Sequence, residues 1–130
     1  MSWFRRPSVF EDPQLGCLTR SGDFWHSAPP PGTPNVCIEG DRERPDPLGI
    51  THARQLLDDA RTLVPIARAF VENDPNAQSF IKGHGTLEWD GFSVMSSGEF
   101  AVNLSLADWP DAMISVRFVD GAPSVVDLAD

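Results

Sequence analysis

Strict alternation of hydrophobic and polar residues marks two strands near the end of the chain, at residues 99–106 and 112–119. Side chains on a strand point to opposite faces in turn, so this pattern predicts half-buried antiparallel strands. The residues expected to face the core are Phe100, Val102, Leu104, Leu106, Ile114, Val116 and Phe118. These two segments are the clearest strand signals in the sequence.

Shorter apolar runs bounded by turn residues predict six more strands. They lie at residues 15–20, 24–27, 35–39, 86–89, 92–95 and 123–128. Asp90-Gly91 is expected to be a turn between two of them, and residues 108–111 are expected to be a loop. Residues 28–34 (APPPGTP) are expected to form an exposed connection, because proline cannot donate to a strand ladder.

A helical stripe of apolar residues runs from Ala53 to Val71 at spacings of three and one. Thr51 is a suitable N-cap, and the sequence from Asn73 to Pro75 is expected to end the helix. Pro65 lies inside the stripe, where its missing N–H removes one backbone hydrogen bond. The pattern therefore predicts one helix kinked at Pro65, or two collinear pieces. Residues 77–85 give no clear assignment.

The order of elements, strands then a helix then strands, predicts an α+β protein. At 130 residues the chain has the length of one domain. We expect residues 1–9 to be an N-terminal tail. Residues 10–130 are expected to form a single two-layer domain, with one long, proline-kinked helix packed on a mostly antiparallel meander sheet.

Negative charge is concentrated in the last third of the chain. The net charge is −9, and residues 84–130 contain eight acidic residues and one arginine, a balance of −7. Such a field disfavours binding to nucleic acid or to an anionic membrane, and it either favours solubility or attracts a basic partner. Without a secretory leader or a long apolar run, we expect a cytoplasmic protein with reduced cysteines.

Candidate catalytic and metal-binding residues do not form a recognisable motif. Cys17 and Cys37 could be neighbours on adjacent strands, but no His or Cys pair has the spacing of a zinc site. Cys17 with His26 could act as a nucleophile, yet a buried structural thiol is the simpler interpretation. The Gly83–Thr86 fragment (GHGT) does not lie between a strand and a helix, as a phosphate loop would. We therefore expect no cofactor, no metal and no catalytic residue.

Tryptophan beside carboxylates suggests a protein-binding surface instead. Trp109 lies between Asp108 and Asp111, and Glu99 belongs to the same acidic third of the chain. Tryptophan is enriched at the energetic centres of interfaces, and carboxylates attract basic partners. The alternative, which the sequence favours, is that Trp109 serves the fold by covering the edge of the sheet.

The opening segment from Asp12 to Trp25 (DPxLGxLTRxGxFW) resembles the start of small bacterial domains of unknown function. Residues 109–121 (WPDAMISVRFVDG) look like their closing strands, and the mid-helix proline also fits. This resemblance implies a hairpin ending in an aromatic pair, then a helix, then a sheet, and it carries no catalytic residues. In size and acidity these proteins are similar to immunity proteins that neutralise polymorphic toxins.

Two functional hypotheses follow from the sequence. The first is a non-catalytic protein-binding module, an immunity or inhibitor protein that neutralises a basic toxin by occlusion. The alternative is a small ligand-binding protein or enzyme with a pocket between the helix and the sheet.

Overall fold

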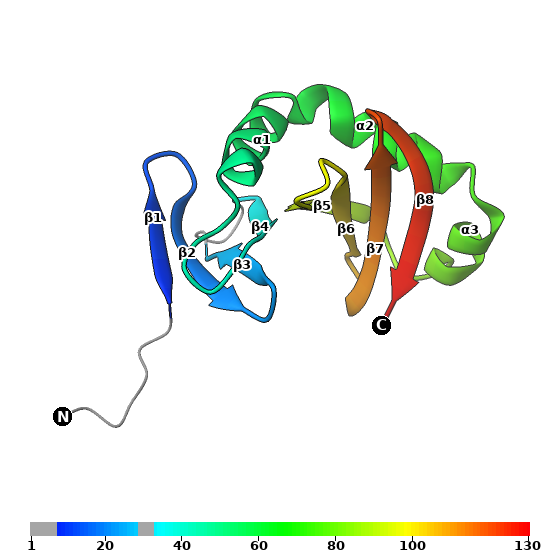
Figure 1. Cartoon of the computed structure of the whole chain (residues 1–130). Helices are drawn as coiled ribbons and strands as arrows, with labels where there is room; N and C mark the ends of the chain where they lie inside the picture. The colour runs from blue at the N-terminus through cyan, green and yellow to red at the C-terminus, as the bar shows by residue number, and fades with distance from the viewer. Residues whose placement is uncertain (1–7, 29–32) are drawn as a thin grey trace.

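The computed structural model describes residues 8–28 and 33–130. It is an α+β protein with one eight-stranded sheet, whose strands lie side by side in sequence order (Figure 1). The strands are β1 (Val9–Asp12), β2 (Gly16–Ser21), β3 (Phe24–Ser27), β4 (Asn35–Glu39), β5 (Leu87–Val94), β6 (Phe100–Leu106), β7 (Trp109–Val119) and β8 (Ala122–Ala129). The predicted tail lies in part outside the described residues, and β1 begins at Val9.

Two antiparallel meanders make up the sheet, and they meet at a parallel pair, β4 and β5. The predicted, mostly antiparallel arrangement is therefore confirmed. Parallel neighbours need a long crossover connection. Three helices supply it, and they are α1 (Pro47–Asp58), α2 (Ala60–Glu72) and α3 (Pro75–Ile81).

The helical region differs from the one long helix that the apolar stripe predicted. It starts at Pro47, because proline fits the first helical position, and Thr51 lies inside α1, where it is not the N-cap. The break falls at Asp59, between α1 and α2, and α2 continues through Pro65. In Figure 1, α1 and α2 arch over the sheet and α3 lies at the far end of α2, near β8.

Two local predictions were wrong, and one segment without an assignment proved to be helical. Residues 77–81, left unassigned, belong to α3, which is capped by the Asp74 carboxylate accepting a hydrogen bond from the Ala77 N–H. The expected turn at Asp90-Gly91 is a bulge within the continuous strand β5. Trp109, placed in a loop by the sequence, begins β7. The predicted connection at residues 28–34 lies largely outside the described residues.

The hydrophobic core lies between the helices and one face of the sheet. As predicted, the inward positions of β6 and β7 are buried, and Trp25 in β3 is fully buried with its indole N–H donating to the Asp41 carbonyl oxygen at 3.0 Å. α1 packs on β4 and β5, whereas α2 packs on β6, β7 and β8. One face of the sheet is thus covered by helices.

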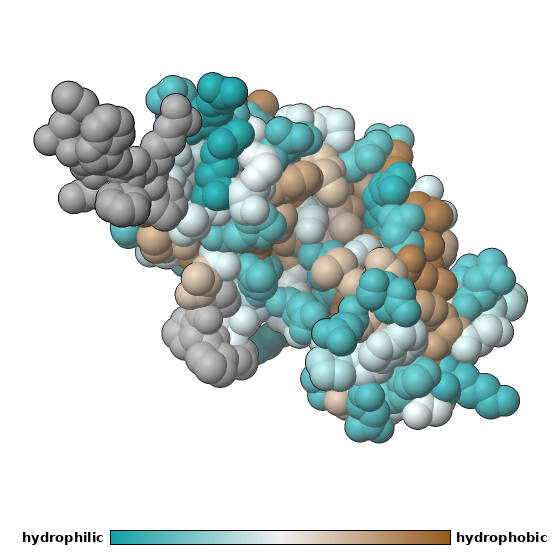
Figure 2. Space-filling view, turned by 90° about the horizontal axis from the view of Figure 1, so that it is seen from below, coloured by the Kyte–Doolittle hydropathy of each residue, from teal (hydrophilic) through white to brown (hydrophobic). Residues whose placement is uncertain are grey.

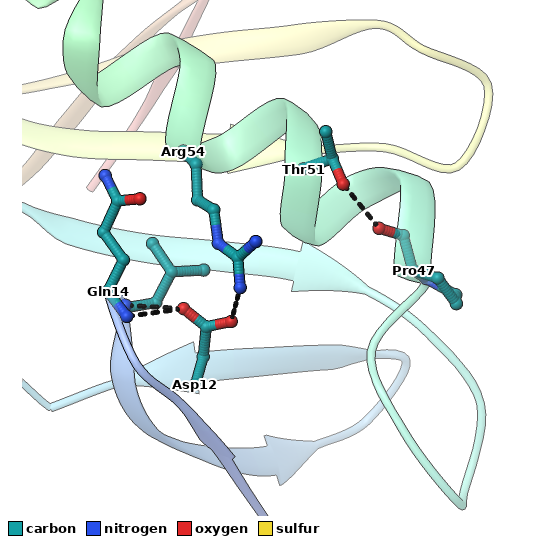
Figure 3. A network of polar contacts seen from close by, with 6 residues as sticks. Asp12, Gln14, Pro47, Thr51 and Arg54 are labelled. Carbon is teal, nitrogen blue, oxygen red and sulfur yellow. Dashed lines mark hydrogen bonds and ion pairs between the residues drawn. The ribbon is translucent and has the colours of Figure 1, made fainter.

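The first hairpin is attached to α1 through Asp12, a buried carboxylate (Figure 3). Asp12 accepts hydrogen bonds from the backbone N–H groups of Gln14 (2.9 Å) and Leu15 (2.8 Å), which close the β1–β2 turn. Its second oxygen accepts a hydrogen bond from the guanidinium of Arg54 on α1. The Asp-Pro start of the opening motif is therefore a turn closure and an anchor for α1.

Candidate functional site

The face of the sheet opposite the helices, here called the open face, is not covered by α1, α2 or α3. Along β7 the buried residues Ile114 and Val116 alternate with Met113, Ser115 and Arg117, which point to the open face. The same alternation places a short set of polar residues on the other strands. On β3 to β8 they include His26, Cys37, Glu39, Glu88, Asp90, Ser93, Asn103, Ser105 and Asp127.

A ladder of short polar side chains crosses the middle of the open face. The Asn103 amide on β6 donates to the Ser93 hydroxyl on β5 at 2.9 Å. The Ser115 hydroxyl on β7 donates to the side-chain amide oxygen (Oδ1) of Asn103 at 3.0 Å. Cross-strand hydrogen bonds of this kind fix the orientation of each side chain. The open face is therefore a rigid polar surface at its centre.

The thiol of Cys37 lies next to this ladder, 3.9 Å from the Nε2 atom of His26. Burial raises the pKa of Cys37 to about 11, although a hydrogen bond with Ser93 lowers it slightly. A nucleophilic cysteine must be a thiolate at neutral pH. Cys37 is a neutral thiol in this setting, so the Cys37–His26 pair is not an activated nucleophile.

The structure also answers whether the two cysteines are adjacent. Cys17 is on β2 and Cys37 on β4, and β3 lies between them. Two strand spacings amount to about 10 Å, which exceeds the Cα separation that a disulfide allows. Both cysteines are free, and Cys17 is exposed, contrary to the buried position expected from its sequence.

Carboxylates outnumber basic groups on the open face. Glu88 and Asp90 are exposed on β5, and Asp127 is exposed on β8. The basic group among them is Arg117, which pairs with Asp127 at 3.0 Å. The electrostatic field on the open face is therefore negative.

Exposed apolar side chains accompany these charges. Met113 on β7 is 55% exposed and Val125 on β8 is 38% exposed. Figure 2, a view from below, shows hydrophilic side chains over much of the surface and hydrophobic ones gathered on the side where β8 lies in Figure 1. Apolar side chains beside charged ones are typical of protein interfaces.

The residues selected from the sequence do not form one cluster. Asp108 and Asp111 are exposed on either side of Trp109, at the corner between β6 and β7. Glu99 immediately precedes β6, so the length of that strand, about 23 Å at 3.3 Å per residue, separates it from the corner. The corner and Glu99 therefore cannot contact the same small feature of a partner.

Trp109 itself packs against α3 and the segment that follows it. Its ring stacks on Phe80 with a centroid distance of 4.8 Å and lies 4.5 Å from the ring of His84. Trp109 remains half-exposed. Its packing shows a structural role, and its part in binding a partner stays a prediction.

A cavity of about 430 Å³ lies at the end of β4 where the chain enters α1. It is bordered by several carboxylates, among them Glu39 and Asp41. Hydrogen bonds from Ser96 hold the pKa of Glu39 below its ordinary value, and backbone N–H groups of Arg44 and Glu43 do the same for Asp41. The Asp41 carboxylate is thus bonded within its own loop, whereas the Glu39 carboxylate is bonded by the turn between β5 and β6.

Neither a metal cluster nor a membrane-spanning helix is found among residues 8–28 and 33–130. No three His, Cys, Asp or Glu side chains in these ranges come together as metal ligands would. No helix in them is long and apolar enough to cross a membrane.

Comparison with known proteins gave no match to the chain among protein-family models, curated proteins or solved structures. The resemblance to domains of unknown function and to immunity proteins is accordingly a prediction still.

Proposed function

We propose that this protein is a non-catalytic protein-binding module that acts on a basic protein. The observation that carries the proposal is the open face, a sheet surface without a covering layer in the described residues and with an excess of carboxylates. A partner with a basic surface would complement this face and associate faster because of electrostatic steering. In this proposal, an immunity or inhibitor protein of this kind neutralises a basic toxin by occluding it.

The arrangement of charge and apolar surface supports binding to a protein. Glu88 and Asp90 provide attraction near the middle of the sheet, and Met113 and Val125 offer apolar area close to Asp127. A few well-packed side chains near the centre of an interface provide most of its affinity, whereas rim charges mainly set the association rate and partner choice. The exposed corner with Asp108 and Asp111 would extend the same negative surface.

The chemistry of the open face favours occlusion over catalysis. Cys37, the one thiol in the polar ladder region, is held neutral by burial. Asn103 bonds to both serines of the ladder, and Ser93 also bonds to the neutral thiol of Cys37, which is not a general base.

Capture of the native partner tests the proposal. The tagged protein and a Glu88→Lys/Asp90→Lys variant are used to capture proteins from native lysate, and the captured protein is then purified and its affinity measured at several salt concentrations. We expect a basic partner whose affinity falls with salt, and a loss of tenfold or more in the variant.

A matched control separates the open face from general charge effects. Asp58→Lys/Glu72→Lys makes the same change of charge on the helices, where both residues are exposed. Lysine suits their positions near helix C-termini, so this variant should fold and bind normally. Equal losses in both variants, or a partner that is acidic, would contradict the proposal.

A further inference from the structure

A second concave surface lies on the helix side of the sheet, between α2 and β5. We call it the α2–β5 groove. It has a volume of about 330 Å³ and is lined by Ala60, Arg61, Val64, Pro65 and Trp89. Trp89 packs against the core side of the sheet, so the groove is separate from the open face.

Helix spacing and one fixed indole build this groove. Ala60 and Val64 are one helical turn apart, and so are Arg61 and Pro65, so the four residues form a continuous strip on α2. Trp89 forms the opposite wall. Its indole N–H donates to the Gly91 carbonyl oxygen at 3.0 Å, and its ring meets Phe92 edge-on at 5.3 Å. The aromatic wall is therefore held in place before any ligand arrives.

Arg61 is the charged residue in the lining, and its guanidinium is exposed. Among the described residues, ion pairs within 4.0 Å involve Arg54 and Arg117, so Arg61 is not paired with a carboxylate there. Pro65 has no N–H to donate to the Arg61 carbonyl oxygen four residues earlier. The groove thus combines an apolar floor with a cation that has no carboxylate partner among the described residues.

We propose that the α2–β5 groove binds a small aromatic carboxylate. The aromatic ring lies between Trp89 and the aliphatic side chains of Ala60 and Val64, where stacking and apolar burial stabilise it. The carboxylate pairs with the guanidinium of Arg61, whose planar donors match its two oxygens. This site goes beyond the proposed protein-binding function and does not depend on it.

Two naphthalene compounds test both parts of the proposal. 2-Naphthoate carries the ring and the charge, and 2-naphthalenemethanol carries the ring alone. For ligands of this size we expect a Kd of about 1 mM for the carboxylate and weaker binding of the alcohol. Titration of the ¹⁵N-labelled protein, followed by two-dimensional NMR, should shift the Trp89 indole signal and the amide signals of Ala60, Arg61 and Val64.

Three variants assign the interactions. Arg61→Gln should weaken 2-naphthoate about fivefold and leave the alcohol unchanged. Arg68→Gln makes the same change two turns along α2, outside the groove, and should alter neither affinity. Ala60→Leu should fill the floor and abolish binding of both compounds.

The wild-type titration keeps the proposal falsifiable if Ala60→Leu does not fold. Shifts centred away from the groove, or none with up to 5 mM 2-naphthoate, an upper limit about five times the expected Kd, would overturn it. Equal weakening by Arg61→Gln and Arg68→Gln would do the same, because it would show a general charge effect. Capture of a basic protein by the open face would be unaffected by any of these results.

Discussion

Replacing Asp12 with alanine should destabilise the protein more than any change at an exposed ion pair. Asp12 is 6% exposed, and its carboxylate accepts two backbone hydrogen bonds and one from Arg54. Alanine leaves these donors without their partner. It also detaches the first hairpin from α1, an attachment that joins residues 42 positions apart.

The size of the effect follows from these three contacts. A hydrogen bond to a charged group contributes about 1.5–3 kcal/mol, but the Arg54 side chain is 39% exposed and regains water when its partner is lost. Allowing for this rehydration, we expect a loss of about 3 kcal/mol. At this chain length, that lowers the melting temperature by about 12 °C.

Urea denaturation of Asp12→Ala and Asp127→Ala gives a direct comparison. Asp127 also pairs with an arginine, but both side chains are about half exposed, so its loss should cost about 0.5 kcal/mol. A loss for Asp12→Ala within 1 kcal/mol of the loss for Asp127→Ala, a margin of the size expected of an exposed pair, would refute the reasoning. The stability loss for Arg54→Ala should lie between those for Asp12→Ala and Asp127→Ala, because Asp12 keeps its backbone donors.

The pH dependence of the same variant provides a second check. Burial raises the pKa of Asp12, but the hydrogen bonds from Arg54, Leu15 and Gln14 outweigh it and hold the pKa below its ordinary value of 3.8. A depressed folded pKa adds stability above the unfolded pKa, and this is lost as pH falls through the folded pKa. The difference in the free energy of unfolding between wild type and Asp12→Ala should therefore be constant near neutral pH and become smaller below a pH of about 4.

Three further outcomes are expected. Gly91→Ala should lower the free energy of unfolding, measured in urea, by at least about 3 kcal/mol, because an added Cβ would lie 1.7 Å from a carbonyl oxygen of β4. Gly98→Ala has open space around it and should lower it by about 1 kcal/mol. In the native protein at pH 7.5, a thiol reagent should label Cys17 rapidly and Cys37 slowly, because Cys17 is exposed and the pKa of Cys37 is raised to about 11; equal rates would contradict this. Burial lowers the pKa of His52, so the unfolded chain binds a proton there more readily than the folded protein and wild type loses stability as pH falls from 7 through 6.5 and below. A His52→Gln variant should lose less stability over this range, as urea denaturation at several pH values would show.

Local sequence patterns predicted the strands correctly, because the alternation of side chains along a strand is a local property. Alternation at residues 99–106 and 112–119 identified β6, β7 and their buried residues, since a strand with one covered face needs period-two hydrophobicity. The strand β1 and the helix α3 were missed. β1 has four residues, and its pairing with β2 depends on the turn that Asp12 closes.

The helix break shows where local propensity fails. Pro65 is the strongest breaker in the apolar stripe, yet α2 runs through it and the chain bends at Asp59. α1 must pack on β4 and β5, whereas α2 must reach β6 to β8. The change of direction between α1 and α2 is thus set by the strands on which they pack. The apolar periodicity of the helices contains no information about those strands.

The sequence by itself determined the composition of the core, the α+β class and the negative charge of the last third of the chain, because hydrophobic period and charge are properties of the residues alone. Only the tertiary structure decided which charges share a surface. It placed Glu88, Asp90 and Asp127 on the open face, separated Glu99 from Trp109, and parted Cys17 from Cys37 by a strand. These relations depend on strand order and register, and pairing between distant segments fixes both.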